Sequence, residues 1–191
     1  MRRAGLAWMA YFFFDFRDEK KQHQNTLLSS LLCQLSDMSD PCWHILSCLY
    51  SAHDEGQSEP SDAALLRCLT DMLEVPKRPP TYIIIDALDE CPDVSGMPAE
   101  REKVLGSLKD LASLRLPNLY ICVTSRLEFD IQKALKPLSL FSFSLHDEHG
   151  QKDDISTYIK ATVNSDVKMQ AWTEQDKKLV IDRLSVKSDG M

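Results

Sequence analysis

Residues 82 to 85 form a run of four apolar residues, Tyr-Ile-Ile-Ile, and Asp86 follows them directly. A continuous apolar run is typical of a strand that is covered on both faces within a parallel sheet. Similar segments occur at residues 9–16 and 118–126. Because helical segments separate these strands, the sequence predicts an α/β fold with a parallel, helix-covered sheet and right-handed crossovers.

The predicted helices follow from apolar residues that recur at helical spacing. Pro41 precedes one of them, and Ser61 is a candidate N-cap of another. The pattern is less clear after residue 126, where a short helix at 131–135, a strand at 140–145 and a helix at 153–163 are expected. A final helix is expected from Thr173. The apolar positions of the clearer helices are Leu27, Leu28, Leu31, Leu32 and Leu35; Cys42, Ile45, Leu46, Leu49 and Tyr50; Leu65, Leu66, Leu69, Met72 and Leu73; and Val104, Leu105, Leu108, Leu111 and Leu114.

The composition and charge of the chain disfavour some classes of binding partner. The chain has 191 residues, 43% of them hydrophobic, which suits one globular domain. Its formal net charge is -7, and Lys and Arg form no stripe, so binding to nucleic acid or to an anionic membrane is not expected. Arg2 and Arg3 precede an apolar run as in a signal peptide, but no small-x-small cleavage site follows. The run is also far shorter than the roughly 20 residues of a membrane span, so a buried strand is expected.

The six cysteines show no metal-type spacing, and we interpret them as reduced, buried thiols of a cytoplasmic protein. One other segment has metal-binding residue types: "HDEH", residues 146–149, could hold a divalent ion, although its spacing is loose.

Polar side chains follow each of the three predicted strands. In open α/β sheets, ligands bind beyond the carboxyl ends of the strands, so these side chains are the candidate site. They are Asp15 and Arg17; Asp86, Asp89 and Glu90; and Thr124, Ser125 and Arg126.

An acid at the end of a buried strand is costly to desolvate unless it has a partner, and a hydrated Mg²⁺ on a nucleotide phosphate is one such partner for Asp86. Asp89 and Glu90 follow closely enough to position or deprotonate a water molecule, and Arg126 can bind phosphate. The alternative is structural: Asp86 and Asp89 cap a loop, and Glu90 is solvated.

Two motifs resemble a known family. "YIIIDALDEC" resembles the Walker B segment of NACHT-type STAND NTPases, and "ICVTSR" resembles their sensor-1 strand. "AYFFFDFRDEKKQ", "LLSSLLCQLS", "SLHDEHGQKDDISTYI" and "LSVKSDGM" are similar to the nephrocystin-like N-terminal NACHT module of many fungal proteins, which often precedes ankyrin repeats. The resemblance covers nearly the whole chain.

The resemblance implies a P-loop NTPase fold, a STAND/AAA-like three-layer sandwich, that binds Mg²⁺ with ATP or GTP. It implies that Asp86 coordinates the metal, that Asp89 and Glu90 are the catalytic acids, and that Thr124 and Arg126 contact the nucleotide from the sensor strand. One local departure is Leu127, where the family usually has a turn-forming residue.

A larger departure is the P-loop, G-x-x-x-x-G-K-[ST], since none of the six glycines is followed by Lys. We therefore expect residues 1–191 to be a single incomplete NACHT module. It would run from the second strand to the helices after the fifth, without the Walker A strand or the winged-helix segment. Such a chain is expected to bind and hydrolyse nucleotide weakly or not at all by itself.

A different function class remains open, a non-catalytic module for self-association or protein interaction. An unpaired strand position exposes backbone donors and acceptors to another chain. The expected partners are a second copy, in a homo-oligomer, or the remainder of a split NACHT protein.

Overall fold

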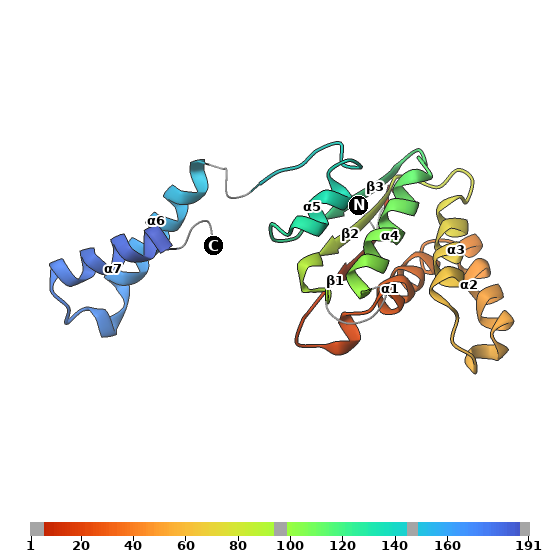
Figure 1. The fold of residues 1–191 in the computed structure, drawn as a ribbon, viewed down its shortest axis with the longest axis horizontal. Coiled ribbons are helices and arrows are strands. Elements are labelled where there is room, and N and C mark those ends of the chain that lie inside the picture. Colours follow the sequence, from red (N-terminus) through yellow and green to blue (C-terminus); the bar gives the residue numbers. More distant parts are fainter. Residues whose placement is uncertain (1–5, 94–98, 145–148, 188–191) are drawn as a thin grey trace. The chain divides into compact units, whose positions relative to one another are not determined.

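The computed structural model describes residues 6–93, 99–144 and 149–187. The chain divides into two compact units, Met1–Ser139 and Leu140–Met191. The first unit is a sheet with its helices (Figure 1). Its main elements are β1 (Trp8–Phe13), α1 (Gln24–Ser36), α2 (Asp40–Ala52), α3 (Asp62–Leu73), β2 (Thr81–Asp86), α4 (Glu100–Ser113), β3 (Leu119–Val123) and α5 (Phe129–Leu135).

The three strands form one parallel sheet in the order β1-β2-β3, with Phe13 opposite Asp86 and Ile85 opposite Val123. The predicted α/β class with a parallel sheet is confirmed. Each new strand is added on the same side of the previous one, so right-handed crossovers place all connecting helices on one face of the sheet. The structure is thus a partial P-loop-like sandwich, in which the described residues supply one helical layer.

The two faces of the sheet differ in burial. On the helix-covered face, side chains such as Ala10, Ile83 and Ile85 are buried in the core. On the other face, Tyr82 and Tyr120 are 40% and 51% exposed and stack on each other with ring centroids 5.0 Å apart. The expectation that residues 82–85 are covered on both faces is wrong for the described structure, because no connection crosses to the second face.

The helices predicted from apolar spacing are confirmed in the first unit, although Tyr50 of α2 is exposed and Leu114 lies just after the end of α4. The five leucines of α1 are buried, as are Val104, Leu105, Leu108 and Leu111 of α4. The Ser61 hydroxyl accepts a hydrogen bond from the Ala64 N–H and caps α3. The apolar segment after Arg3 contributes β1, a partly buried strand, and none of the described helices is long and apolar enough to cross a membrane.

The two edges of the sheet differ in what pairs with their outer backbone groups. At the β1 edge, the Gln34 side chain replaces a neighbouring strand: its Oε1 accepts from the Tyr11 N–H at 3.1 Å, and its Nε2 donates to the Tyr11 carbonyl at 2.7 Å. At the other edge, β3 has no further strand beside it in the described residues. Since the Thr124 N–H donates to the Ile85 carbonyl, the backbone groups of Ile121 and Val123 point to that outer edge.

The second unit contains α6 (His149–Ser165) and α7 (Glu174–Lys187), which pack against each other. Both helices were predicted, and the Thr173 hydroxyl accepts from the Asp176 N–H at the start of α7. The prediction of a strand at 140–145 is wrong for residues 140–144, the part that the structure describes. Residues 140–144 are irregular, Phe141 and Phe143 are more than 80% exposed, and a strand requires a neighbour that the described residues do not offer.

All six cysteines are free thiols, as expected, but only Cys42, Cys68 and Cys91 are buried. Cys33 and Cys48 are exposed on helices, and Cys122 is exposed on the β3 strand. Their apolar sequence neighbours suggested burial, but alternate positions of a half-covered sheet and of surface helices face solvent.

Candidate functional site

Asp86 ends β2 and is joined there to the neighbouring strand. The Thr124 hydroxyl donates a hydrogen bond to Asp86 Oδ1 and accepts one from the Ala87 N–H at 3.1 Å. The Thr124 carbonyl then accepts from the Leu88 N–H at 3.0 Å. Thr124 therefore fixes both the Asp86 carboxylate and the start of the turn that follows it.

The chain turns sharply after Asp86. Ala87 has a left-handed backbone, with φ 54° and ψ 47°, and a short 3₁₀ turn follows at Leu88–Glu90. Leu88 is fully buried in the core. The left-handed residue is strained for a side chain larger than glycine, and the buried leucine anchors the turn that carries Asp89 and Glu90.

Asp89 joins the turn to the segment after β3. Its Oδ1 accepts from the Arg126 N–H at 3.0 Å, and its Oδ2 lies 3.5 Å from Arg126 Nε. The Asp89 side chain is only 10% exposed, whereas that of Arg126 is 77% exposed. The carboxylate is thus fixed, and the guanidinium lies largely in solvent.

Glu90 joins the same turn to the segment after β1, since its Oε2 accepts from the Phe16 N–H at 3.1 Å. Asp15 is instead occupied by its neighbour Arg17, whose Nε and N–H each donate to Asp15 Oδ1 at 3.0 Å. These hydrogen bonds hold the pKa of the Asp15 carboxyl below its ordinary value. Ser125 donates to the carbonyl of Arg126 at 2.8 Å, and its hydroxyl makes no hydrogen bond to the acids among the described residues.

The structure thus brings the ends of the three predicted strands together at one edge of the sheet. Two residues that hold them were missed. Gln22 donates from Nε2 to the Phe16 carbonyl at 2.7 Å, and Arg101 donates to the carbonyls of Asp89 and Cys91. Arg101 carries a sequence signal: it is a basic residue in the first turn of a helix, where the helix dipole disfavours a positive charge.

Cys91 directly follows the turn at Leu88–Glu90, the acidic turn, and is fully buried. Its Sγ lies 3.5 Å from the Gln22 carbonyl, and burial raises the pKa of its thiol to about 12. A thiol with such a pKa is protonated at neutral pH and is a poor nucleophile or metal ligand. Cys91 thus belongs to the packing of the site.

The acids do not converge on one point. Among the described residues, no group of three or more His, Cys, Asp or Glu side chains could hold a metal ion. Asp86 fits Mg²⁺ as a single carboxylate ligand, because this ion usually keeps several waters and takes one or two protein carboxylates. The alternative metal segment at 146–149 lies outside the residues whose side chains are described.

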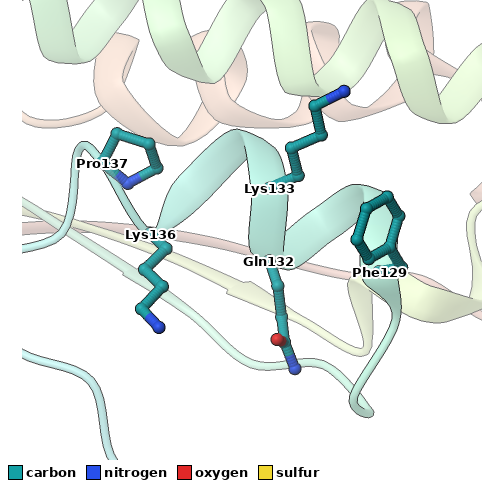
Figure 2. A pocket seen from close by; sticks show the side chains of 5 residues that line it. All are labelled: Phe129, Gln132, Lys133, Lys136 and Pro137. Carbon is teal, nitrogen blue, oxygen red and sulfur yellow. The ribbon is translucent and has the colours of Figure 1, made fainter.

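A shallow hollow lies on α5 and is lined by Phe129, Gln132, Lys133, Lys136 and Pro137. None of the acids lines it. Figure 2 shows that the two lysine side chains point away from each other, so they do not form a joint anion site.

Comparison with known proteins identifies one family. The model of the family described as nephrocystin 3, N-terminal, matches residues 2–126, a segment that includes Asp86, Asp89, Glu90, Thr124 and Arg126. No curated protein and no solved structure matches the chain. Because the match covers well over half of the 191 residues, the chain belongs to the nephrocystin 3 N-terminal family.

Proposed function

We propose that this chain carries the metal- and water-handling half of a NACHT-type nucleoside triphosphatase site. The observation that supports it is the joining of three strand ends by acid side chains: Asp86 to Thr124, Asp89 to Arg126, and Glu90 to Phe16. In this proposal residues 82–91 act as a Walker B segment, and residues 121–126 act as a sensor-1 segment.

Asp86 is the proposed ligand of a hydrated Mg²⁺. The Thr124 hydroxyl occupies Oδ1, which leaves Oδ2 without a hydrogen bond from the described residues. When bound, Mg²⁺ would neutralise charge on the phosphate oxygens. Asp86 and Thr124 contribute the fixed position of the carboxylate.

Asp89 and Glu90 have different proposed roles. Both Asp89 oxygens face Arg126, so Asp89 mainly holds the sensor segment. Glu90 accepts the Phe16 N–H only through Oε2, and its Oε1 accepts no hydrogen bond in the described structure. Glu90 is therefore the better placed of the two acids to orient a water molecule or to take its proton.

Arg126 is the proposed phosphate-contacting residue. Its N–H is fixed by Asp89, while its guanidinium makes only a 3.5 Å contact and is mostly exposed. Because the Arg126 guanidinium is solvated, its side-chain ion pair with Asp89 is expected to be weak, about 1 kcal/mol or less. The guanidinium can thus exchange Asp89 for a phosphate at small cost.

The proposed affinity for nucleotide is low. P-loop sites hold phosphates with the backbone amides of a Gly-rich loop and with its Lys, and these 191 residues contain no G-x-x-x-x-G-K-[ST] segment. The proposed cofactors, Mg²⁺ with ATP or GTP, would be held here only from the metal side, and hydrolysis by the chain alone is not expected.

Paramagnetic Mn²⁺ tests the metal assignment, since it replaces Mg²⁺ and broadens nearby NMR signals. At millimolar Mn²⁺ we expect broadening of the amide signals of residues 86–90 and 124–126. The Asp86→Ala variant should lose this effect, and Asp71→Ala, which removes an exposed acid of α3, should retain it. Broadening that persists in Asp86→Ala, or that maps elsewhere, would contradict the proposal.

A second candidate function is self-association through β3. This edge strand has the sequence LYICV, without charge or proline, and its outer backbone groups have no neighbouring strand in the described residues. Edges of this kind pair readily with other chains. The proposed partner is a second copy, because two identical uncharged strands can pair antiparallel about a two-fold axis without like-charge repulsion.

Light scattering after size-exclusion chromatography tests this second candidate. We expect a dimer at tens of micromolar that dissociates in Tyr120→Lys, which places a charge on the exposed face of β3. Tyr158→Lys, an exposed position on α6, is the control and should remain dimeric. A monomer at all concentrations would rule this candidate out.

A further inference from the structure

Arg101 is a buried charge in an unfavourable place. Its side chain is 9% exposed and lies in the first turn of α4, after the N-cap residue Ala99. Burial of a cation is costly, and the positive end of the helix dipole adds to the cost. The position must therefore be stabilised by specific contacts.

Those contacts all go to the acidic turn and its surroundings. Arg101 Nη2 donates to the Asp89 carbonyl at 2.7 Å, and Nε donates to the Cys91 carbonyl at 2.9 Å. Nη1 lies 3.4 Å from a carboxylate oxygen of Asp130 and 3.9 Å from one of Asp93. The planar guanidinium thus binds two carbonyls on either side of Glu90 at once, a geometry that a lysine cannot reproduce.

The turn needs such support, because it follows the strained residue Ala87 and contains only a single 3₁₀ turn. Its own backbone bonds run from the Glu90 N–H to Ala87 and from the Cys91 N–H to Leu88. Without Arg101, the carbonyls of Asp89 and Cys91 would lose their donor, and the directions of the Asp89 and Glu90 side chains would no longer be fixed.

We infer that Arg101 is the positioning residue of the acidic site: it holds the turn that presents Asp89 and Glu90 and, through Asp130 of α5, ties this turn to the segment after β3. That Asp89 and Glu90 act on a nucleotide rests on the proposed function. The positioning itself is measurable without metal or nucleotide, so its failure is distinct from failure of the metal assignment.

Amide hydrogen exchange measured by NMR on the metal-free chain tests the inference. Two amides report directly on the acids: the Arg126 N–H bonded to Asp89, and the Phe16 N–H bonded to Glu90. In Arg101→Gln we expect both to exchange about tenfold faster or more. The Thr124 N–H, bonded to Ile85 in the sheet, should keep its rate, which separates lost positioning from general destabilisation.

Two further variants, one conservative and one at a control position, show whether the effect is specific to the Arg101 guanidinium. Arg101→Lys keeps the charge but not the two-carbonyl geometry, so it should show an intermediate acceleration. Arg67→Gln, an exposed arginine of α3, is the matched control and should change none of the three rates. Unchanged exchange at Arg126 and Phe16 in Arg101→Gln would overturn the inference.

If Arg101→Gln does not fold, Arg101→Lys tests the hold on the turn, and Asp130→Asn tests the link to α5. It removes the negative charge of Asp130, which is 38% exposed, and so weakens this contact with the guanidinium while the carbonyl contacts stay in place. We expect faster exchange at the Arg126 N–H with the Phe16 N–H unchanged. Equal rates at Arg126 in this variant and the wild type would overturn the proposed link to α5.

Discussion

Replacement of Thr124 by valine removes one hydroxyl and nearly conserves shape, so it isolates the bond between the two strand ends. The Thr124 hydroxyl donates to the Asp86 carboxylate and accepts from the Ala87 N–H. A hydrogen bond to a charged group contributes about 1.5–3 kcal/mol and a neutral one about 0.5–1.5 kcal/mol. Because Thr124 is exposed and water replaces part of the loss, we expect a decrease of about 2 kcal/mol in the free energy of unfolding.

Urea denaturation followed by the fluorescence of Trp8, which is buried in β1, measures this change. With a slope of about 2 kcal/mol per molar urea, the midpoint should fall by about 1 M. Thr124→Ser is the matched control: it keeps the hydroxyl and should lie within about 0.5 kcal/mol of the wild type. If the valine and serine variants unfold at the same midpoint, the hydroxyl does not hold the strand ends together.

Three other perturbations test the surroundings of the site. Ala87→Gly should raise the free energy of unfolding by about 0.5 kcal/mol, since glycine relieves the left-handed strain but adds freedom to the unfolded chain; a loss above about 1 kcal/mol in the same urea assay would contradict this. Burial raises the pKa of Glu100, but hydrogen bonds from Lys103 and the Gln24 N–H outweigh it and hold the pKa below the ordinary 4.5. Stability from Glu100 is thus present above pH 4.5 and lost as the pH falls further. Glu100→Gln should lose less stability than the wild type between pH 5 and pH 3, and parallel pH profiles would count against it. Iodoacetamide followed by mass spectrometry should modify the three exposed cysteines and spare the buried ones, since burial raises the pKa of Cys68 to about 11 and that of Cys91 to about 12; rapid labelling of Cys91 in the folded chain would show that the acidic turn is open.

The sequence predicted the strand ends because hydrophobic patterning and strand direction are local properties. The apolar runs before Asp86 and Thr124 form neighbouring parallel strands, so the polar residues that follow them lie at the same edge of the sheet. The same pattern did not reveal that Tyr82 and Tyr120 are exposed, because coverage of a sheet face depends on which side the connections cross.

Other features depend on long-range contacts that no local pattern contains. The apolar segment at 140–144 has strand-like composition but no neighbour among the described residues, so it stays irregular. The contact between Arg101 and the Asp89 carbonyl depends on how α4 packs beside the turn, and only the unusual position of a basic residue in a first helical turn indicated it.

Titration of the purified chain with a fluorescent ATP analogue and Mg²⁺ tests whether this chain holds only the metal side of a nucleotide site, without the phosphate-binding loop. We expect no saturable binding at low micromolar concentrations, for the wild type and for Asp86→Ala alike. Low-micromolar binding by the wild type that is lost in Asp86→Ala would contradict it, because the acids of β2 would then belong to a complete site.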